Sequence, residues 1–206
     1  MTDEQIDRKI AVIFATDVVG YSKSMEQHEA QTIKNLRACR KLLEKSLKQY
    51  DGRIFNTAGD SVLAEFSSAV SAVECAAEFQ RNVKQRNQSA KKAEVMEFRV
   101  GVNMGDVVIE GENLYGDGVN IAARLEALAQ PNGISISKRI HEFVQAKTNL
   151  SFNDLGVQQV KENTFYAFDV LLDPSQKRQL SKPVFSKFSQ FVAVAIIVAI
   201  AGVGLF

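Results

Sequence analysis

Two aspartates stand where the chain passes from strand patterns into turns. Ile10–Phe14 is an unbroken apolar run with the length and β-branching of a buried central strand, and Asp17 follows it closely. Asp60 lies in the turn Thr57–Asp60, between two short strand patterns. A carboxylate at the end of a buried strand is costly unless a cation pairs with it. Because ligands gather at such strand ends in open α/β sheets, both aspartates are candidate binding residues.

Asp17 has two interpretations that its local sequence leaves open. The first is an ordinary N-cap for the helix pattern that follows. The second is a metal ligand whose neighbouring backbone N–H groups cradle a phosphate. In a split β-α-β-β sheet the first strand and the hairpin lie side by side, so the carboxylates of Asp17 and Asp60 can converge. The remaining alternative for this pair is two solvated turn aspartates.

A converging pair of carboxylates would have a definite chemistry. Two hard oxygen ligands at one sheet edge suit Mg²⁺ or Mn²⁺, with substrate phosphates completing the octahedra. This is the two-metal arrangement for in-line displacement at phosphorus, in which one ion activates the attacking oxygen and the other neutralises the leaving group.

Composition excludes several other functions. The 206 residues include 25 basic and 24 acidic ones, so the chain has no electrostatic footprint for nucleic acid. Cys39 and Cys75 fall at apolar-face spacing in two helical patterns, which indicates buried thiols and no disulfide or metal site. His28 and His141 lie near neither a cysteine nor each other, so zinc chemistry and a Ser-His-Asp triad are poorly supported.

Apolar periodicity predicts the elements that would position these residues. The predicted helices are Glu29–Tyr50, Val70–Val83, Val119–Ala129 and Lys138–Ala146. The strands predicted after the first are Arg53–Asn56, Ser61–Phe66, Phe98–Met104, Val107–Glu110, Ile134–Ile136 and a closing hairpin of Val157–Val160 with Phe165–Val170. The polar run Lys84–Lys92 is predicted to be a surface loop.

The order of these elements predicts the fold class. The order β-α-β-β-α-β, followed by further elements, is that of a ferredoxin-like core in an α+β protein. Such a sheet is mostly antiparallel and carries its helices on one face.

The composition changes at Asp173. The following stretch, DPSQKRQLSKPVFSK, is polar, interrupted by proline and basic, and is predicted to be a linker. Phe191–Phe206 is apolar apart from two glycines. At 1.5 Å per residue it reaches about 24 Å, against roughly 30 Å for a hydrocarbon core. We interpret it as a transmembrane segment cut short by the end of the chain, which adds a C-terminal transmembrane helix to the predicted fold.

Charge near this segment predicts an orientation. Basic residues precede it, and the positive-inside rule then predicts a membrane-anchored protein whose main domain is in the cytoplasm. The polar start MTDEQIDRK predicts no signal peptide. The basic residues are Lys177, Arg178, Lys182 and Lys187.

A family resemblance is carried by three segments: FATDVVGYS, GRIFNTAGDSVLAEF and FRVGVNMGDVVIEGENLYGDGVNIAARLE. In this order and spacing they resemble the class III nucleotidyl cyclases, the catalytic domain of adenylyl and guanylyl cyclases. The resemblance covers roughly residues 8–170. It implies a cyclase catalytic domain over residues 1–172, followed by a basic linker over 173–187 and the transmembrane segment over 188–206. The implied enzyme is a phosphorus–oxygen lyase for second-messenger signalling.

The implied reaction is attack of the ribose 3′-OH on the α-phosphorus of a nucleoside triphosphate, which gives a 3′,5′-cyclic nucleotide and pyrophosphate. By the resemblance, Asp17 and Asp60 hold two Mg²⁺ or Mn²⁺ ions per site, and the carbonyl of Val18 adds a ligand. The β- and γ-phosphates would be held by the turn formed by Val18, Val19, Gly20, Tyr21 and Ser22.

Asn120 and Arg124, in VNIAAR, match the family's transition-state pair. Their spacing agrees with this role, because residues i and i+4 share one face of a helix. Arg124 would place its forked guanidinium on the α-phosphate as charge grows there, while Asn120 orients the ribose. Lys161 lies where the family has a triphosphate-binding lysine, but the local match, VKENTFY, is loose, and a surface lysine is the alternative.

In this family the metal pair and the asparagine–arginine pair come from opposite subunits, so the resemblance implies an obligatory homodimer with sites at its interface. The positions that read the base depart from the family pattern. Where adenylyl cyclases have a lysine and an aspartate or threonine, this chain has Asn56 and Asn113. Asparagine offers a donor and an acceptor without charge, so it can read several base edges.

Several functions stay open at this stage. ATP is the first choice because it is the commonest substrate in the family, and the alternatives are GTP or, for a pyrimidine cyclase, UTP or CTP. A catalytically silent nucleotide sensor is a further alternative, although all four chemical positions are retained. A diguanylate cyclase is disfavoured, because NTAGD stands where its Gly-Gly-acidic-acidic-Phe hairpin would be.

Overall fold

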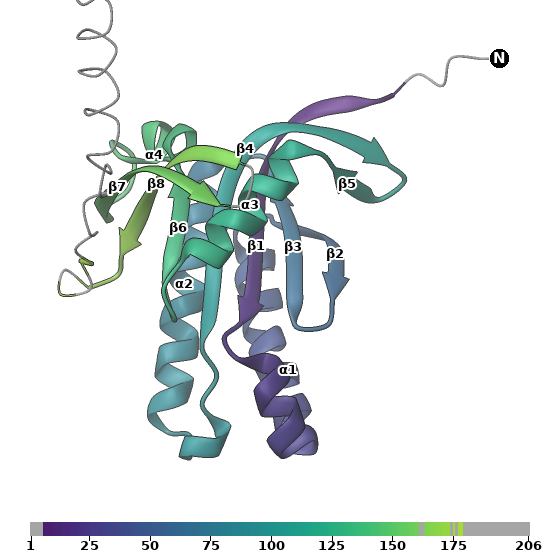
Figure 1. Cartoon of the computed structure of the whole chain (residues 1–206), viewed down its shortest axis with the longest axis vertical. Coiled ribbons are helices and arrows are strands. Elements are labelled where there is room, and N and C mark those ends of the chain that lie inside the picture. Colours follow the sequence, from purple (N-terminus) through teal and green to yellow (C-terminus); the bar gives the residue numbers. More distant parts are fainter. Residues whose placement is uncertain (1–5, 161–162, 174, 176, 179–206) are drawn as a thin grey trace, which may run out of the picture.

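The computed structural model describes residues 6–160, 163–173, 175 and 177–178. One eight-stranded sheet organises it, with strand order β2-β3-β1-β4-β6-β8-β7 and with β5 paired to β4 outside this path (Figure 1). The described strands are β1 (Arg8–Val18), β2 (Arg53–Ala58), β3 (Ser61–Phe66), β4 (Phe98–Glu110), β5 (Asn113–Tyr115), β6 (Ile134–Ser137), β7 (Ser151–Val160) and β8 (Asn163–Leu171). The described helices are α1 (Tyr21–Gln49), α2 (Ala69–Gln88), the 3₁₀ turn η1 (Lys92–Glu94), α3 (Asp117–Leu128) and α4 (Lys138–Val144).

Strand β1 is the buried central strand that its apolar run predicts. It pairs antiparallel with β3 on one side and with β4 on the other. Its side chains alternate between two cores: Val12 and Phe14 face the core under α1 and α2, and Ile13 faces the core under α3. Both faces of the strand are therefore covered, which explains why its sequence is continuously apolar.

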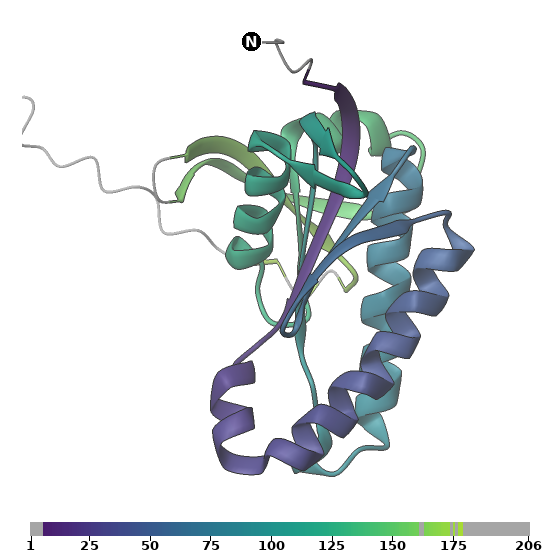
Figure 2. The same cartoon turned by 90° about the vertical axis from the view of Figure 1, so that its right-hand side faces the viewer.

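The predicted placement of the helices is wrong. Helices α1 and α2 cover one face of the sheet, while α3 lies across the other face (Figures 1 and 2). The sequence did not indicate the second core, which contains Ala122 of α3, because α3 is short and contributes few residues to it.

The predicted mostly antiparallel, ferredoxin-like sheet is likewise corrected to a mixed one. Strands β4 and β6 run parallel, with Val102 opposite Ile136, whereas the other pairs are antiparallel. The connection from β4 to β6 passes through β5 and α3, and a helical crossover of this kind is what joins parallel neighbours.

Two element boundaries also differ from the sequence prediction. Strand β4 continues through Gly105 and Asp106, because both residues stay paired with β1 and no turn forms there. Helix α2 extends through much of the predicted loop as far as Gln88. Its last turn is held by side chains that bond the segment around η1: Arg86 donates to the carbonyl of Glu94, and Asn87 to that of Met96.

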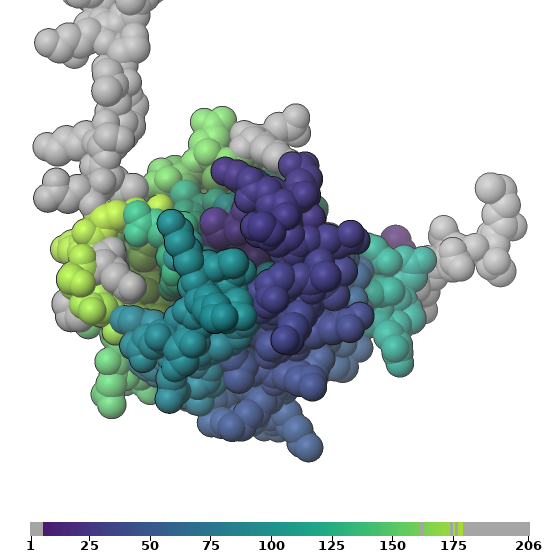
Figure 3. Space-filling view, turned by 90° about the horizontal axis from the view of Figure 1, so that it is seen from below, coloured from purple at the N-terminus to yellow at the C-terminus, as the bar shows by residue number. Residues whose placement is uncertain are grey.

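Helix α1 is bent. His28 has non-helical backbone angles, which divides the helix into a short first part and a long second part (Figure 2). The second part corresponds to the helix predicted from Glu29. The side chain of Asn35 reaches the carbonyl of Ala93, and α1 and the segment around η1 lie side by side at the surface (Figure 3). Cys39 in α1 and Cys75 in α2 are buried free thiols, as predicted.

The predicted C-terminal transmembrane helix is corrected as part of the fold. No helix within the described residues is long and apolar enough to cross a membrane. The longest of them, α1, has 29 residues but carries charged side chains along its exposed face. The predicted transmembrane segment, residues 188–206, lies outside the described residues.

Candidate active site

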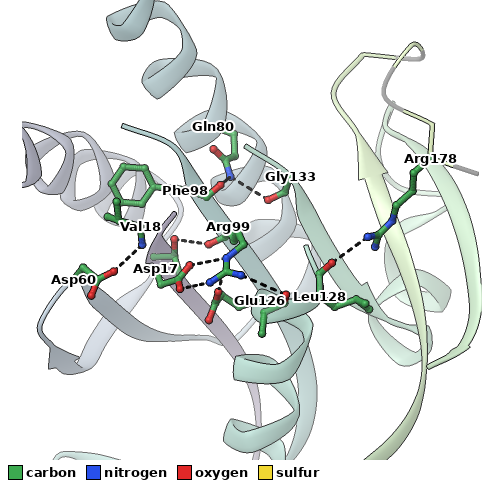
Figure 4. A network of polar contacts seen from close by, with 12 residues as sticks. Asp17, Val18, Asp60, Gln80, Phe98, Arg99, Glu126, Leu128, Gly133 and Arg178 are labelled. Atoms are coloured by element: carbon green, nitrogen blue, oxygen red, sulfur yellow. Dashed lines mark hydrogen bonds and ion pairs between the residues drawn. The ribbon is translucent and has the colours of Figure 1, made fainter. Parts of the chain in front are cut away.

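Asp17 and Asp60 come together as the sequence predicts. Asp17 lies near the end of β1, and Asp60 lies in the tight turn between β2 and β3, where Gly59 has a positive φ of 60° that suits the first position of a type II′ turn. The backbone N–H of Val18 donates to Oδ2 of Asp60 at 3.0 Å (Figure 4). Asp17 is not an N-cap, because the N-cap of α1 is Gly20.

Arg99 is the counter-ion of Asp17. The antiparallel register places the two residues directly opposite each other on β1 and β4. Nε of Arg99 lies 3.1 Å from Oδ1 of Asp17, and Nη2 bonds Oδ2 (Figure 4). The same Nε lies 3.2 Å from Oε1 of Glu126 on α3. One guanidinium therefore faces two carboxylates, with Asp60 close by.

This cluster holds more negative charge than Arg99 balances. Burial, and then the neighbouring carboxylate of Asp17, raise the pKa of Glu126 to about 9. The hydrogen bond to Asp17 raises the pKa of Arg99, so the guanidinium stays charged. The carboxylates of this cluster therefore favour positive charge nearby, either a proton on Glu126 or the guanidinium of Arg99. A bound cation would be favoured for the same reason.

The donor set fits a divalent ion of the Mg²⁺ type. Among the described residues there is no group of three or more His, Cys, Asp or Glu placed to hold a metal. The protein would thus contribute two carboxylates, from Asp17 and Asp60, and leave the other positions to water and substrate oxygens. This sparse protein ligation is the usual pattern for Mg²⁺ beside phosphates.

The turn after β1 forms the N-terminus of α1. Gly20 has a φ of 67° and caps the helix without a side-chain hydrogen bond. The N–H groups of Val18 and Val19 are already used, by Asp60 and by the carbonyl of Glu97. The amides of Gly20, Tyr21 and Ser22 donate to no acceptor in the described part of the chain. Free amides at a helix N-terminus are a ready anion site, so the predicted phosphate cradle narrows to these three.

Asn120 and Arg124 lie one turn apart on α3, as predicted. Ala122 and Leu125 face the sheet and are fully buried, and the helical repeat puts Asn120 and Arg124 on the opposite side. Asn120 is exposed, while Nη1 of Arg124 is buried without a hydrogen-bond partner in the described chain. Neither side chain bonds the carboxylates of Asp17 or Asp60 of its own chain.

Asn56 and Asn113 lie on two strands that come close in space without pairing in the sheet. Strand β2 carries Asn56 and β5 carries Asn113, and both side chains are half-buried. A hydrogen bond of 3.0 Å from Nη1 of Arg53 on β2 to the carbonyl of Glu112 ties β2 to the residue just before β5. Lys161 lies outside the described residues.

Sequence reasoning assigned no role to Arg99, Glu126 or Arg40. Arg99 is the charged residue of the predicted strand Phe98–Met104, but its pairing with Asp17 depends on the strand register and is not visible in the sequence. Arg40, on α1, donates from Nη2 to the carbonyl of Gly59 at 2.5 Å and so steadies the turn that carries Asp60. No sequence pattern indicates a role for Glu126 or Arg40.

A cavity of about 470 Å³ lies away from this cluster. It is bordered by the start of α3, the start of α4 and strand β8, and none of the predicted site residues lines it.

Comparison with known proteins identifies the family. Residues 2–172 match the family model of the adenylate and guanylate cyclase catalytic domain. The chain belongs to this family, and the domain is a phosphorus–oxygen lyase domain of the class III cyclase type.

Individual relatives agree with this assignment. A protein of Rhizobium meliloti named putative adenylate cyclase 3 is 46% identical over 162 residues, which are 78% of this chain and 28% of the relative. An adenylate cyclase of Streptomyces coelicolor is 28% identical over 68% of this chain and 35% of its own length. The chain therefore spans about a third or less of these curated relatives.

Solved structures share the fold. An adenylate/guanylate cyclase/hydrolase from Silicibacter pomeroyi is 35% identical, covers 82% of this chain and 99% of its own, and superposes with a TM-score of 0.76. The adenylyl cyclase CyaB of P. aeruginosa is 24% identical, with a TM-score of 0.70 over 86% of this chain and 100% of its own.

Proposed function

We propose that this chain converts a nucleoside triphosphate, with ATP the first choice, into a 3′,5′-cyclic nucleotide and pyrophosphate for second-messenger signalling. The observation that carries the proposal is the convergence of Asp17 and Asp60 beside the free amides that begin α1. A pair of oxygen ligands next to an anion cradle suits a metal–triphosphate complex.

Asp17, Asp60 and the carbonyl of Val18 would hold two Mg²⁺ or Mn²⁺ ions. When bound, such ions supply Lewis-acid stabilisation of charge on the phosphates and favour ionisation of the attacking hydroxyl. The amides of Gly20–Ser22 would bind the β- and γ-phosphates. A bond then forms between O3′ and the α-phosphorus, and the bond from that phosphorus to the pyrophosphate oxygen breaks.

Asn120 and Arg124 would complete the site from a second copy of the chain. The pair points away from its own sheet, and Nη1 of Arg124 has no partner within the described chain. Asn120 is exposed and Arg124 is only partly buried, so the accessible part of the guanidinium fork can meet a phosphate held by a second copy. We therefore propose an obligatory homodimer with two sites, in which Arg124 stabilises charge on the α-phosphate and Asn120 orients the ribose.

Base choice would rest on Asn56 and Asn113. The names of two relatives, which call them adenylate cyclases, support ATP as the first choice of substrate. The neutral amides leave GTP, UTP and CTP as competitors, since they lack the charge of the usual purine readers. Lys161 stays a candidate for contact with the triphosphate. We place the working domain in the cytoplasm, where its nucleotide substrates are found.

The test is to incubate the purified chain with ATP, GTP, CTP and UTP in turn, with Mg²⁺ or Mn²⁺, and to resolve the products. The expected result is a 3′,5′-cyclic nucleotide and pyrophosphate in equal amounts, formed only with metal. Binding of nucleotide and metal without turnover of any triphosphate would contradict the proposal and would favour a nucleotide sensor.

A further inference from the structure

One arginine holds the segment that follows β8 against the domain. Nε and Nη2 of Arg178 bond the two carboxylate oxygens of Asp169 on β8, at 2.7 and 2.9 Å. Its Nη1 donates to the carbonyl of Leu128 at 3.1 Å (Figure 4). The carbonyl of Arg178 accepts from Nδ2 of Asn153 on β7 at 3.2 Å. Side chain and backbone of this one residue thus bond two strands and one helix.

These contacts are unlike those of a surface ion pair. The side chains of Arg178 and Asp169 are only 16% and 12% exposed. Oδ1 of Asp169 also accepts from Oγ of Ser135 at 2.9 Å, and Ser135 is fully buried. The carboxylate of Asp169 is therefore also held in place by Ser135, independently of Arg178. A bidentate arginine pair on a fixed carboxylate has defined geometry and directs the remaining nitrogen, Nη1, towards Leu128.

Leu128 is the last residue of α3, where helical carbonyls have no partner within the helix. Arg178 caps this carbonyl with a positive charge, which also suits the negative end of the helix dipole. The neighbouring carbonyl, of Ala127, accepts a longer bond of 3.5 Å from Nη1 of Arg99, the counter-ion of Asp17. The C-terminal end of α3 is thus held by two arginines that come from different parts of the chain (Figure 4).

We propose that Arg178 is a positioning residue for the cyclase reaction. It fixes the end of α3 and so sets where Asn120 and Arg124 stand relative to the substrate. The inference rests on the proposed function, because it requires that α3 carries the transition-state pair. It links the segment that follows β8 to the chemistry, although Arg178 itself touches no reacting atom.

The first test compares Arg178→Gln with Lys177→Gln in the full chain. Lys177 is exposed, and the described structure gives its side chain no hydrogen bond, so the control removes the same charge one residue away. Arg178→Gln should lower kcat by about tenfold, since small misplacements of reacting groups are costly, and leave KM and Mn²⁺ affinity unchanged. An unchanged kcat, a change in KM alone, or an equal loss in the control overturns the proposal.

A second variant guards against simple misfolding. Arg178→Lys keeps the charge beside Asp169 but lacks the fork that spans Asp169 and Leu128 together. It should unfold at the wild-type temperature and still show reduced kcat. Wild-type kcat in this variant would show that charge suffices and would overturn the positioning role.

The sharpest test uses mixed dimers of Asp17→Ala and Arg124→Ala chains, in which the one intact site takes α3 from the Asp17→Ala chain. Arg178→Gln added to the Asp17→Ala chain should lower the activity of the mixture, whereas the same change in the Arg124→Ala chain should leave it unchanged. Equal loss from both placements overturns the inference. If the mixture is inactive even without Arg178→Gln, the shared-site proposal has failed instead, and the comparison with Lys177→Gln still decides the role of Arg178.

Discussion

At the scale of single residues, the site depends on how charge is arranged around Asp17. Its carboxylate is bound by Arg99, lies beside Glu126 and neighbours Asp60. The two aspartates could be predicted as neighbours from the sequence, because Asp17 follows an apolar strand pattern and Asp60 lies in the turn of the adjacent hairpin. Arg99 could not, because it is 82 residues from Asp17 and meets it only through the register of β1 and β4.

The first prediction concerns the two proposed metal ligands. Asp17→Ala or Asp60→Ala should lower kcat by about 100-fold or more and abolish tight Mn²⁺ binding, because one carboxylate alone leaves the phosphates poorly neutralised. Electron paramagnetic resonance of Mn²⁺ and product formation are the two measurements. Asp106→Ala, an exposed carboxylate outside the site, is the control. Near wild-type turnover with Mn²⁺ in either variant would show that the assignment is wrong.

The second prediction concerns the base. Asn56→Lys combined with Asn113→Asp should shift selectivity towards ATP, because the pair then offers a charged donor and a charged acceptor. Each mismatched buried hydrogen bond costs about 1–3 kcal/mol, so the ratio of kcat/KM between triphosphates can change by a few orders of magnitude. The measurement is kcat/KM for all four triphosphates on both proteins. Unchanged ratios would mean that these positions do not read the base.

At the scale of elements, the contact between α3 and β4 sets the position of the helix that carries the proposed pair, Asn120 and Arg124. A Cβ at Gly101 of β4 would lie 2.2 Å from the carbonyl oxygen of Ala122 and 2.2 Å from the amide nitrogen of Glu126. Gly101→Ala should therefore push α3 off the sheet, lower the free energy of unfolding by about 1–3 kcal/mol and reduce kcat. Denaturant unfolding and turnover measure the two effects. Wild-type values of both would show that α3 does not need this close approach.

The outer end of the sheet gives a pH prediction. The ring of His141 on α4 stacks on Phe168 of β8 with centroids 3.9 Å apart. Burial lowers the pKa of His141, against a weaker opposite effect of the Asp154 and Glu142 carboxylates. The unfolded chain therefore binds the proton more readily, so this stability is present above the ordinary histidine pKa of about 6.5 and is lost as pH falls through the folded value.

The thermal midpoint should accordingly fall more steeply between pH 7 and pH 5 in the wild type than in His141→Gln. Scans at a series of pH values measure the difference. Parallel curves for the two proteins would contradict this account of the His141 ring and its surroundings.

At the scale of the whole molecule, local patterns predicted most elements but not how they assemble. The order of strands and helices up to β3 follows from periodicity, because these elements are long and strongly patterned. The parallel pairing of β4 with β6 and the position of α3 on the second face depend on contacts between distant segments. The apolar run at the C-terminus led to a membrane helix as part of the fold, a prediction that the described helices do not support.

The central claim is that each active site is shared between two copies of the chain. It predicts that Asp17→Ala and Arg124→Ala chains, each inactive alone, regain activity when mixed. After full subunit exchange, half of the dimers are mixed and each has one intact site, so the mixture should reach about one quarter of wild-type activity. Two affinity tags can demonstrate the exchange while product formation is followed. An inactive mixture in which mixed dimers are demonstrably present would contradict the claim.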